Sequence, residues 1–456
     1  MGRATAASSL VGLVCKNKWL GCGRPGRRGR RLRVRGPRPT KSLKILILSQ
    51  FFAPEPIFKG LPFARELKAR GHKVEVLTGF PNYPGGRVYE GYRIRLWQRE
   101  TMEGIRVTRV LLYPSHDSSP VRRILNYASF ALSAATLGAL LTERPDVVYV
   151  YHPPPSVGLA AIALKAWKGV PFVYDIQDLW PDSVAATGML RNPLVLGGIR
   201  KWCAFVYRNA GHIAVLSPGF KRVLTERGVP AEKITVIRNW CDEDSSRSVA
   251  CDDAEAERLG MRGRFNIVFA GTMGKAQGLD TVLKAAEICA QRNPAVQFVF
   301  VGGGTERARL EGLSAGRSNV RFLAYRPPSE MPAIFTLADA LLVHLKKGPL
   351  FEITIPSKIQ AYLATGKPII IGVAGDAADI VREAGAGLEV ESGNAEQIAE
   401  ASLSLAGMGT DRLKAMGAAG KAYYFRELSL RRGVDLFEGI FNQLVEGRRK
   451  RLPHTA

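Results

Sequence analysis

The sequence predicts an α/β protein built from two doubly wound sheets of parallel strands. Short apolar runs recur along the chain, and most are followed by a loop containing Gly or Pro and then by a helical stretch. This alternation is typical of parallel sheets that carry helices on both faces. At 456 residues the chain is too long for one ordinary core, so two domains are expected.

The composition is that of a globular protein with an excess of positive charge. Hydrophobic residues make up 46% and charged residues 23% of the chain, which is usual for soluble proteins. The formal net charge is +25, and residues 1–44 hold thirteen lysines and arginines but no acid. The remainder is still basic, which favours an anionic substrate or an anionic membrane surface as a partner. Nucleic acid is not expected as a partner, because no motif combines basic and aromatic residues for its recognition.

Residues 1–42 lack the pattern of a folded domain. The run GRPGRRGRRLRVRGPRP is broken by Gly and Pro and has no apolar periodicity. We expect a basic disordered arm, a targeting segment or an extension from a misassigned start codon. A secretory signal is not favoured, because the short apolar stretch precedes the basic run. The six cysteines are scattered without a CxxC pair, so free thiols in a reducing cytosol are expected.

The first domain is predicted to span residues 43–240. It opens with a buried strand at 43–48, a loop, a helix at 61–69 and a second strand at 74–78. Gly60, at the end of the first loop, lets the backbone approach a ligand closely because it has no Cβ. The loop lacks the G-x-G-x-x-G fingerprint, which argues against a dinucleotide oxidoreductase. A long loop at 79–92, rich in Pro, Gly and Tyr, is a candidate binding loop.

The apolar segment 121–141 allows three interpretations. Residues 124–141 carry no charge, and roughly 20 apolar residues can span a bilayer. Asn126, Ser129, Ser133 and Thr136 dilute the segment, and a sheet strand follows it. The segment is therefore a membrane span, a core helix, or a core helix that also docks on the membrane surface.

Two polar residues follow strands of this domain. The strand at 146–151 ends at His152, and the strand at 171–175 leads to Asp178. Residues at the carboxyl ends of parallel strands can face a ligand, so both are candidates for catalysis. The alternatives are a hydrogen-bonded loop histidine and a cap of the following helix. After strands at 210–217 and 233–239, a polar stretch at 241–263 is the predicted linker.

The second domain is predicted at residues 264–429. Strands are expected at 265–271, 296–301, 319–323, 340–345 and 368–372. A helix should begin near Pro356 and end at Gly366, and Pro368 forbids its continuation. This helix begins where a strand ends, so its N–H groups and positive dipole end would favour a phosphate. Lys346, Lys347 and Lys358 flank that end, although they could equally be solvated lysines of an ordinary crossover.

The run PSKIQAYLATGKPI, which begins at Pro356, resembles the nucleotide-sugar site of family 4 glycosyltransferases. These are retaining enzymes of GT-B architecture, in which a cleft separates the two domains. The chain is most similar to the subgroup that makes bacterial surface polysaccharides such as O-antigen, capsule and colanic acid, which includes N-acetyl-L-fucosamine transferases. The resemblance covers residues 43–444 and implies that helix 430–450 crosses back onto the first domain.

The resemblance implies transfer from a nucleotide diphosphate sugar, a UDP-sugar by expectation, to a lipid-linked saccharide carried on polyprenyl diphosphate. It also implies a cytoplasmic enzyme, peripheral on the inner face of the cell membrane. The donor residues would be Gly60, Gly271, Thr272, Gly274, Lys275, Gly303, Arg326, Glu352, Ser357, Lys358 and Gln360. The acceptor loop would include Pro81, Asn82 and Tyr83, and the catalytic residues would be Asp178, His152 and Lys358.

The sequence departs from the family pattern at several of these places. Gln177 stands where many members have a histidine, and Thr272 and Gln277 replace a basic pair. Of the two glutamates of the family, one matches Ala361 and the other falls beside Glu352. No pair of carboxylates marks a nucleophile, and retention through a short-lived oxocarbenium-like ion pair needs none. No D-x-D metal motif lies in a suitable loop, so neither a metal nor a cofactor is expected.

Two other functions fit the pattern less well. A sugar-nucleotide epimerase of similar two-domain form is one, and a non-catalytic sugar-nucleotide-binding subunit is the other. The second is motivated by the missing family residues at Thr272, Gln277 and Ala361. The products separate the three: a longer lipid-linked glycan, an isomerised nucleotide sugar, or no product.

Overall fold

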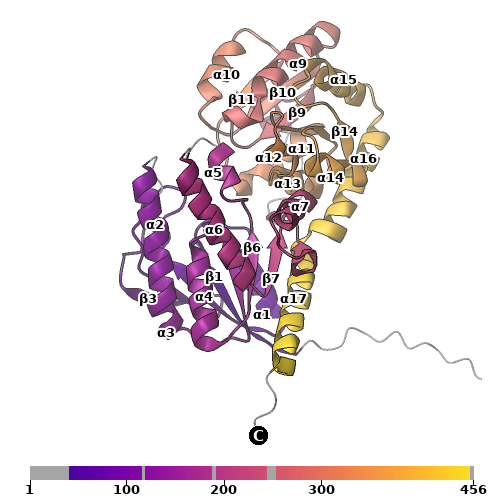
Figure 1. Cartoon of the computed structure of the whole chain (residues 1–456). Coiled ribbons are helices and arrows are strands. Elements are labelled where there is room, and N and C mark those ends of the chain that lie inside the picture. Colours follow the sequence, from indigo (N-terminus) through magenta and orange to yellow (C-terminus); the bar gives the residue numbers. More distant parts are fainter. Residues whose placement is uncertain (1–40, 116–118, 187–189, 191, 244–252, 452–456) are drawn as a thin grey trace, which may run out of the picture. The chain divides into compact units, whose positions relative to one another are not determined.

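A computed structural model describes residues 41–115, 119–186, 190, 192–243 and 253–451. Within these ranges the chain forms two sheets, each with helices packed on both faces (Figure 1). The prediction of two parallel-sheet α/β domains is confirmed. Most of segment 1–42, and residues 244–252 of the predicted linker, lie outside the described residues, whereas α8 (Asp253–Arg258) falls inside that linker.

The first sheet has the strand order β3-β4-β2-β1-β5-β6-β7-β8 in the part of the chain that is described. Its strands are β1 (Lys44–Ser49), β2 (Lys73–Gly79), β3 (Trp97–Met102), β4 (Ile105–Val110), β5 (Val147–His152), β6 (Phe172–Ile176), β7 (His212–Val215) and β8 (Ile234–Val236). All neighbours pair in parallel except β3 and β4, which form an antiparallel hairpin at the sheet edge. The hairpin turns through Glu103 and Gly104, both with positive φ. Sequence analysis missed this hairpin, because β3 is polar and alternately exposed.

Two hydrophobic clusters cover the faces of this sheet. One contains residues of α2 (Pro120–Ser133), η1 (Ala134–Gly138), α3 (Ala139–Leu141), α4 (Val157–Lys168), α6 (Pro193–Asn209) and α7 (Pro218–Glu226). The other joins α1 (Leu61–Ala69) to the C-terminal α17 (Leu430–Arg451) through Phe63, Tyr149, Trp240 and Phe437. Helix α17 therefore packs on the first sheet although it follows the second in sequence.

The segment from α2 to α3 packs on the sheet along one side and is exposed along the other. By length and composition alone it could cross a membrane, although part of it is buried against the protein. Its polar residues bind the sheet: Asn126 accepts from Gln50 at 2.5 Å and donates to the Tyr113 carbonyl at 2.7 Å. Ser129 accepts from the Tyr113 N–H at 2.8 Å, and Ser133 donates to the Leu111 carbonyl. Three of the four residues that dilute the apolar segment therefore attach it to the first domain, whereas the Thr136 hydroxyl donates to the Leu132 carbonyl of the same helical segment at 2.7 Å.

The second sheet has the order β11-β10-β9-β12-β13-β14 over the described residues, and all its neighbours are parallel. Its strands are β9 (Phe265–Ala270), β10 (Val296–Val301), β11 (Val320–Leu323), β12 (Ala340–His344), β13 (Ile369–Gly372) and β14 (Gly387–Glu389). One face carries α11 (Met331–Leu337), α13 (Lys358–Thr365), α14 (Asp376–Glu383) and η6 (Tyr424–Leu428). The other carries α9 (Leu279–Arg292), α10 (Arg307–Leu313), α15 (Ala395–Ala406) and α16 (Thr410–Tyr423).

Helix α13 is the helix predicted from the PSKIQAYLATGKPI run. Gly366 ends it in the left-handed conformation at φ 75°, as expected for a C-terminal cap. The short α12 (Pro349–Glu352) and strand β14 were not predicted from the sequence. Both lie at the same edge of the sheet as the start of α13, so they shape the region where a ligand is expected.

Candidate active site

The loops after β9 and β10 lie against one another at the carboxyl end of the second sheet. The Gly271 N–H donates to the Val301 carbonyl at 2.9 Å, and the Met273 N–H donates to the Gly303 carbonyl at 2.7 Å. A Cβ on Gly302 would lie 2.2 Å from the Gly271 oxygen, and one on Gly304 would lie 2.3 Å from the Met273 oxygen. Only glycine permits this approach. Gly271 and Thr272 remain exposed, so backbone at this strand end is open to a ligand.

Lys358 brings a cation to this strand end from the first residue of α13. Its Nζ lies 3.6 Å from the ring centroid of Phe269, the residue before the last of β9. The same nitrogen lies 3.4 Å from the position that a Cβ on Gly271 would occupy. Burial lowers the pKa of Lys358 to about 7. Within the described residues no hydrogen bond or ion pair holds this ammonium, so its charge is available to an anion.

The other predicted donor residues divide into exposed and occupied ones. Gly274 and Lys275 line a cavity of 180 Å³ with Lys346. Gly303 and Ser357 have open space or solvent around them. Arg326 is held by an ion pair with Glu330 at 2.9 Å, so it would have to exchange partners to bind a ligand.

Gln360, one of the predicted donor residues, and Tyr362 of the same helix point inward. Gln360 is buried, and its amide, oriented to donate, reaches the carbonyls of Pro356 and Ser357 at 3.2 and 2.8 Å. Tyr362 is also buried, and its hydroxyl accepts from the Ala270 N–H at 2.8 Å. These contacts support α13 and the end of β9, which is a scaffold role.

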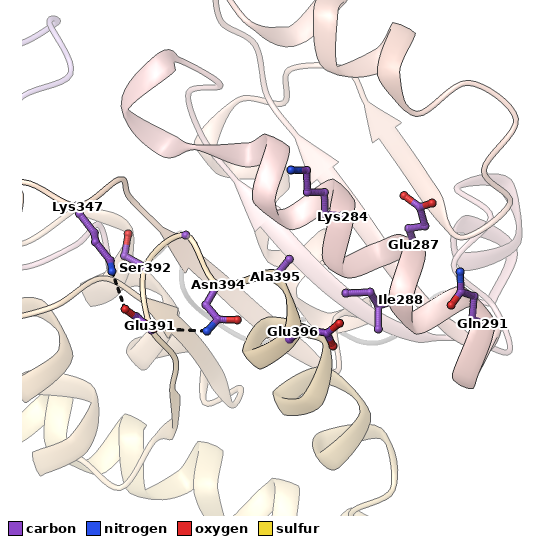
Figure 2. Close-up of a pocket in the computed structure, with 11 residues that line it drawn as sticks. Lys284, Glu287, Ile288, Gln291, Lys347, Glu391, Ser392, Asn394, Ala395 and Glu396 are labelled. Atoms are coloured by element: carbon purple, nitrogen blue, oxygen red, sulfur yellow. Dashed lines mark hydrogen bonds and ion pairs between the residues drawn. The ribbon is translucent and has the colours of Figure 1, made fainter.

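Two larger cavities adjoin this region. Glu352 lines one of 470 Å³, at the carboxyl ends of β12, β13 and β14. The other, of 510 Å³, lies between α9 and the start of α15, and Figure 2 shows Lys284, Ile288 and Glu396 along it. Of its lining residues, the sequence analysis singled out Lys347. Exposed backbone and an unpaired cation meet at the end of β9 and the start of α13.

An aromatic pocket of 420 Å³ lies at the carboxyl end of the first sheet. Aromatic side chains from five segments line it: Phe51, Phe58, Tyr83, Tyr127, Tyr151 and Trp180. Arg123 and Asp178 are its charged residues. Asp178 reaches solvent at the pocket, and the protein around its carboxyl raises its pKa by desolvation. A carboxylate among aromatic rings is suited to bind a sugar hydroxyl.

Glu55, which was not predicted from the sequence, forms hydrogen bonds with the backbone of the predicted acceptor loop. Its carboxylate accepts from the backbone N–H groups of Asn82 and Tyr83, each at 2.8 Å. Pro81 and Asn82 are buried, and Asn82 donates to the Phe80 carbonyl at 2.9 Å. Of the three predicted loop residues, only Tyr83 lines the pocket.

His152 does not line this pocket, although Tyr151 and Pro153 on either side of it do. The residue is fully buried, with its ring centroid 5.4 Å from that of Tyr174. Burial lowers the pKa of His152 to about 3, so the ring is neutral. Gln177, where many family members have a histidine, accepts a hydrogen bond from Asn239 at 2.8 Å. Of the two predicted catalytic residues of the first domain, Asp178 lines the pocket, whereas the His152 ring is buried and does not.

Gly60 adjoins a buried ion pair that was not predicted. The Lys59 ammonium donates to the Asp175 carboxylate at 2.8 Å, and both side chains are fully buried. The Tyr149 hydroxyl donates to the same carboxylate oxygen at 2.6 Å. Lys59 also lies over the rings of Trp240 and Phe437, at 5.5 and 5.1 Å. The pair therefore joins the first loop, β6 and α17, and Gly60 follows it at the start of α1.

No group of three or more His, Cys, Asp or Glu side chains that could hold a metal ion occurs in the described ranges.

Two protein-family models match the chain, one ending where the predicted linker begins and the other starting within that linker. A model of the glycosyl transferase 4-like domain matches residues 61–240, and a model of glycosyl transferases group 1 matches residues 253–422. Between them they span most of the chain. A curated relative, the putative colanic acid biosynthesis glycosyl transferase WcaI of Escherichia coli strain K12, is 29% identical over 72% of this chain and 83% of its own length.

Solved structures share the fold at low sequence identity. A glycosyltransferase from Rickettsia africae matches with a TM-score of 0.62 and 17% identity, covering 88% of this chain and 99% of that one. Anabaena Alr3699/HepE, solved in complex with UDP-glucose, matches with a TM-score of 0.60 and 16% identity, covering 90% of this chain and all of its own. Two parallel-sheet domains of this form define a GT-B protein. The chain belongs to the family 4, group 1 glycosyltransferases and is a nucleotide-sugar-dependent enzyme of EC class 2.4.

Proposed function

We propose that this enzyme transfers a sugar from a UDP-sugar to a lipid-linked saccharide, with retention at the anomeric carbon, during assembly of a cell-surface polysaccharide. The observation that carries the proposal is the unpaired ammonium of Lys358 beside the exposed backbone of Gly271. The E. coli relative, named for colanic acid biosynthesis, supports the pathway class. The UDP-glucose bound in the Anabaena structure supports the donor class.

In the proposed reaction the bond between the anomeric carbon and the phosphate oxygen breaks, and its electron pair goes to the phosphate. An acceptor hydroxyl then bonds to the same face of that carbon, and its proton passes to the departing phosphate oxygen. Lys358 neutralises the charge that grows on the diphosphate. Because the phosphate takes the proton, no protein nucleophile is needed.

The aromatic pocket is the proposed acceptor subsite. Aromatic rings stack on the apolar faces of sugars, and the Asp178 carboxylate can accept from a hydroxyl. Arg123 lies on the same wall, near the start of α2, and can pair with a phosphate of the carrier. The pocket thus has a group for each part of a saccharide linked to a diphosphate.

The proposed location is the inner face of the cell membrane, with the enzyme bound peripherally. Helices α2, α4 and α6 lie side by side on one face of the first sheet (Figure 1). Apolar side chains on this face are exposed, among them Ile124, Leu132, Leu140, Leu194 and Phe205. Arg122, Arg200 and Lys201 are exposed on the same helices. Apolar and basic side chains together favour an anionic lipid surface.

A panel of nucleotide sugars tests the donor. A ligand at about 100 times its Kd should add about 2.7 kcal/mol to the free energy of unfolding, which a thermal scan detects. UDP-sugars should stabilise the protein, and one of them should support transfer to a polyprenyl-diphosphate saccharide, seen as a mass gain of one sugar. Stabilisation by another nucleotide sugar and not by UDP-sugars would overturn the donor assignment.

A further inference from the structure

One histidine links two of the loops at the carboxyl end of the second sheet. His344 is the last residue of β12 and is buried. Its Nδ1 lies 2.7 Å from the carbonyl oxygen of Gln277, in the loop after β9. Its Nε2 accepts from the N–H of Gly393, in the loop after β14, at 3.1 Å. Both bonds form at once only if the ring is neutral and carries its proton on Nδ1.

The ring fills space that two glycines leave open. A Cβ on Gly278 would lie 3.2 Å from the Cε1 of His344, and a Cβ on Gly372 would lie 2.6 Å from its Cδ2. Gly278 also has φ 58°, which glycine adopts without strain. The imidazole is therefore fixed on two sides by backbone, in addition to its two hydrogen bonds.

The loop after β9 is attached to β12 at a second point and is also closed on itself. The Lys346 N–H donates to the Ala276 carbonyl at 2.9 Å. The Gln277 side chain accepts from the Gly274 N–H at 2.9 Å, which closes the turn η4 (Lys275–Gln277). Gln277, which replaces a basic residue of the family, thus has a structural role.

The loop after β14 borders the cavity of 510 Å³ between α9 and α15. In Figure 2, Lys347 bonds to Glu391 and Glu391 to Asn394, at 2.6 and 3.4 Å. Ser392 donates to the Leu345 carbonyl, and Gly393 lines the same cavity. His344 therefore connects the loop of Gly271–Gly278, where the donor diphosphate is proposed, with the wall of a neighbouring cavity.

We propose that His344 is a positioning residue that fixes the Gly271–Gly278 loop in the conformation that binds the donor diphosphate. It does so by donating from Nδ1 to Gln277 and accepting at Nε2 from Gly393. It is not a catalytic residue, because its buried ring cannot touch substrate. The inference rests on the proposed donor site, and burial, which lowers the pKa of His344, agrees with the neutral ring that both bonds require.

The test compares His344→Ala and His344→Asn with the wild-type enzyme. An asparagine amide places a donor near the position of Nδ1, so it can keep the bond to Gln277 but not the bond from Gly393. Hydrogen exchange of peptides covering 271–278 and 391–397 reports on each loop without any ligand. Binding of UDP and the split between donor KM and kcat report on function.

We expect His344→Ala to speed exchange in both peptides and to weaken UDP binding roughly tenfold, since each net hydrogen bond contributes modestly. Donor KM should rise while acceptor KM stays unchanged. His344→Asn should restore protection of 271–278 and most of the affinity, but not the protection of Gly393. If His344→Ala does not fold, His344→Asn alone decides by this asymmetry.

Unchanged exchange in 271–278, or faster exchange with unchanged UDP affinity, would overturn the positioning role. If the wild-type enzyme fails to bind UDP, the proposed donor fails, whereas the exchange pattern still shows whether His344 holds the two loops. The two failures are thus distinguishable.

Discussion

Lys358 allows a substitution that should stabilise the fold while it weakens donor binding. Lys358→Met keeps the length of the side chain and removes its charge. Because burial lowers the pKa of Lys358 from 10.5 to about 7, the folded protein loses this proton near neutrality, whereas the unfolded chain keeps it until about pH 10.5. The cost of burying the charge is therefore fully present below about pH 7 and declines as pH rises toward 10.5.

The size of the gain follows from the position of the side chain. Lys358 is half-buried, so water screens part of the penalty, and we expect Lys358→Met to raise the free energy of unfolding by roughly 1–2 kcal/mol at pH 6. The gain should shrink by pH 9. Urea unfolding at the two pH values measures it, and Lys414→Met, at an exposed position of α16, is the matched control.

The same group makes donor binding depend on pH. A UDP-sugar has no group that titrates near pH 7. Because the Lys358 amine must be protonated to bind the donor, its deprotonation should weaken donor binding about tenfold per pH unit above about pH 7. At pH 7.5 binding should take up about 0.8 proton per donor, which calorimetry in buffers of different ionisation enthalpy detects. Lys358→Ala should lower kcat/KM on the order of ten- to a hundredfold, and Lys358→Arg should recover only part.

Two results would refute this reasoning. The first is a Lys358→Met protein that is less stable than wild type at pH 6. The second is a folded variant that binds UDP-sugar as tightly as the wild type, with the same proton uptake. The first result would show that the ammonium stabilises the fold, and the second that it does not bind the donor.

Three further predictions concern the first domain. Asp178→Asn should lower kcat on the order of tenfold or more with donor KM unchanged. Because the pKa of the Asp178 carboxyl is raised, the acidic limb of the wild-type pH–rate profile should lie above the range of an ordinary aspartate. If steady-state kinetics give the variant the same profile as the wild type, Asp178 takes no part in the reaction. Lys59→Met should destabilise the fold by about 3–5 kcal/mol, since it leaves Asp175 charged and buried. The double variant Lys59→Met/Asp175→Leu should recover much of the lost free energy of unfolding in denaturant titrations, and full additivity of the two changes would contradict a coupled pair. Ile124→Glu should reduce sedimentation with anionic vesicles severalfold, whereas Leu313→Glu, at a similarly exposed position on α10, should not. Equal loss for both variants, or retention of the wild type on membranes after a carbonate wash, would contradict peripheral binding through α2.

The sequence predicted those parts of the fold that depend on apolar runs. The buried strands of both sheets and the C-terminal cap at Gly366 follow from such runs and from glycine and proline. The β3–β4 hairpin did not, because a polar edge strand has no apolar run to mark it. Strand β14 was missed because three residues are too few for a pattern.

The candidate site was predictable where residues follow strand ends, and not where pairing across the chain decides their role. Lys358 and Asp178 were found from their positions after strands. His152 has the same sequence signal, yet its ring is buried. Lys59 and Asp175 lie 116 residues apart, so their ion pair leaves no local trace.

Residues that position other segments of the chain were the hardest to predict from the sequence. His344 stands in an apolar strand, and a histidine at the end of such a run was its only sign. Asn126 seemed to weaken an apolar helix, whereas it joins that helix to the sheet. Contacts between distant segments define both roles, and a single sequence does not specify these contacts.

The central claim is that this enzyme builds a lipid-linked saccharide from a UDP-sugar held by Lys358. Mass spectrometry of the lipid fraction, after incubation of the wild-type and Lys358→Ala enzymes with UDP-sugars and a polyprenyl-diphosphate saccharide, tests it most directly. We predict a product heavier by one sugar with the wild type, and on the order of ten- to a hundredfold less of it with the variant at subsaturating donor. An isomerised nucleotide sugar without a lipid product, or equal product from both enzymes, would contradict the claim.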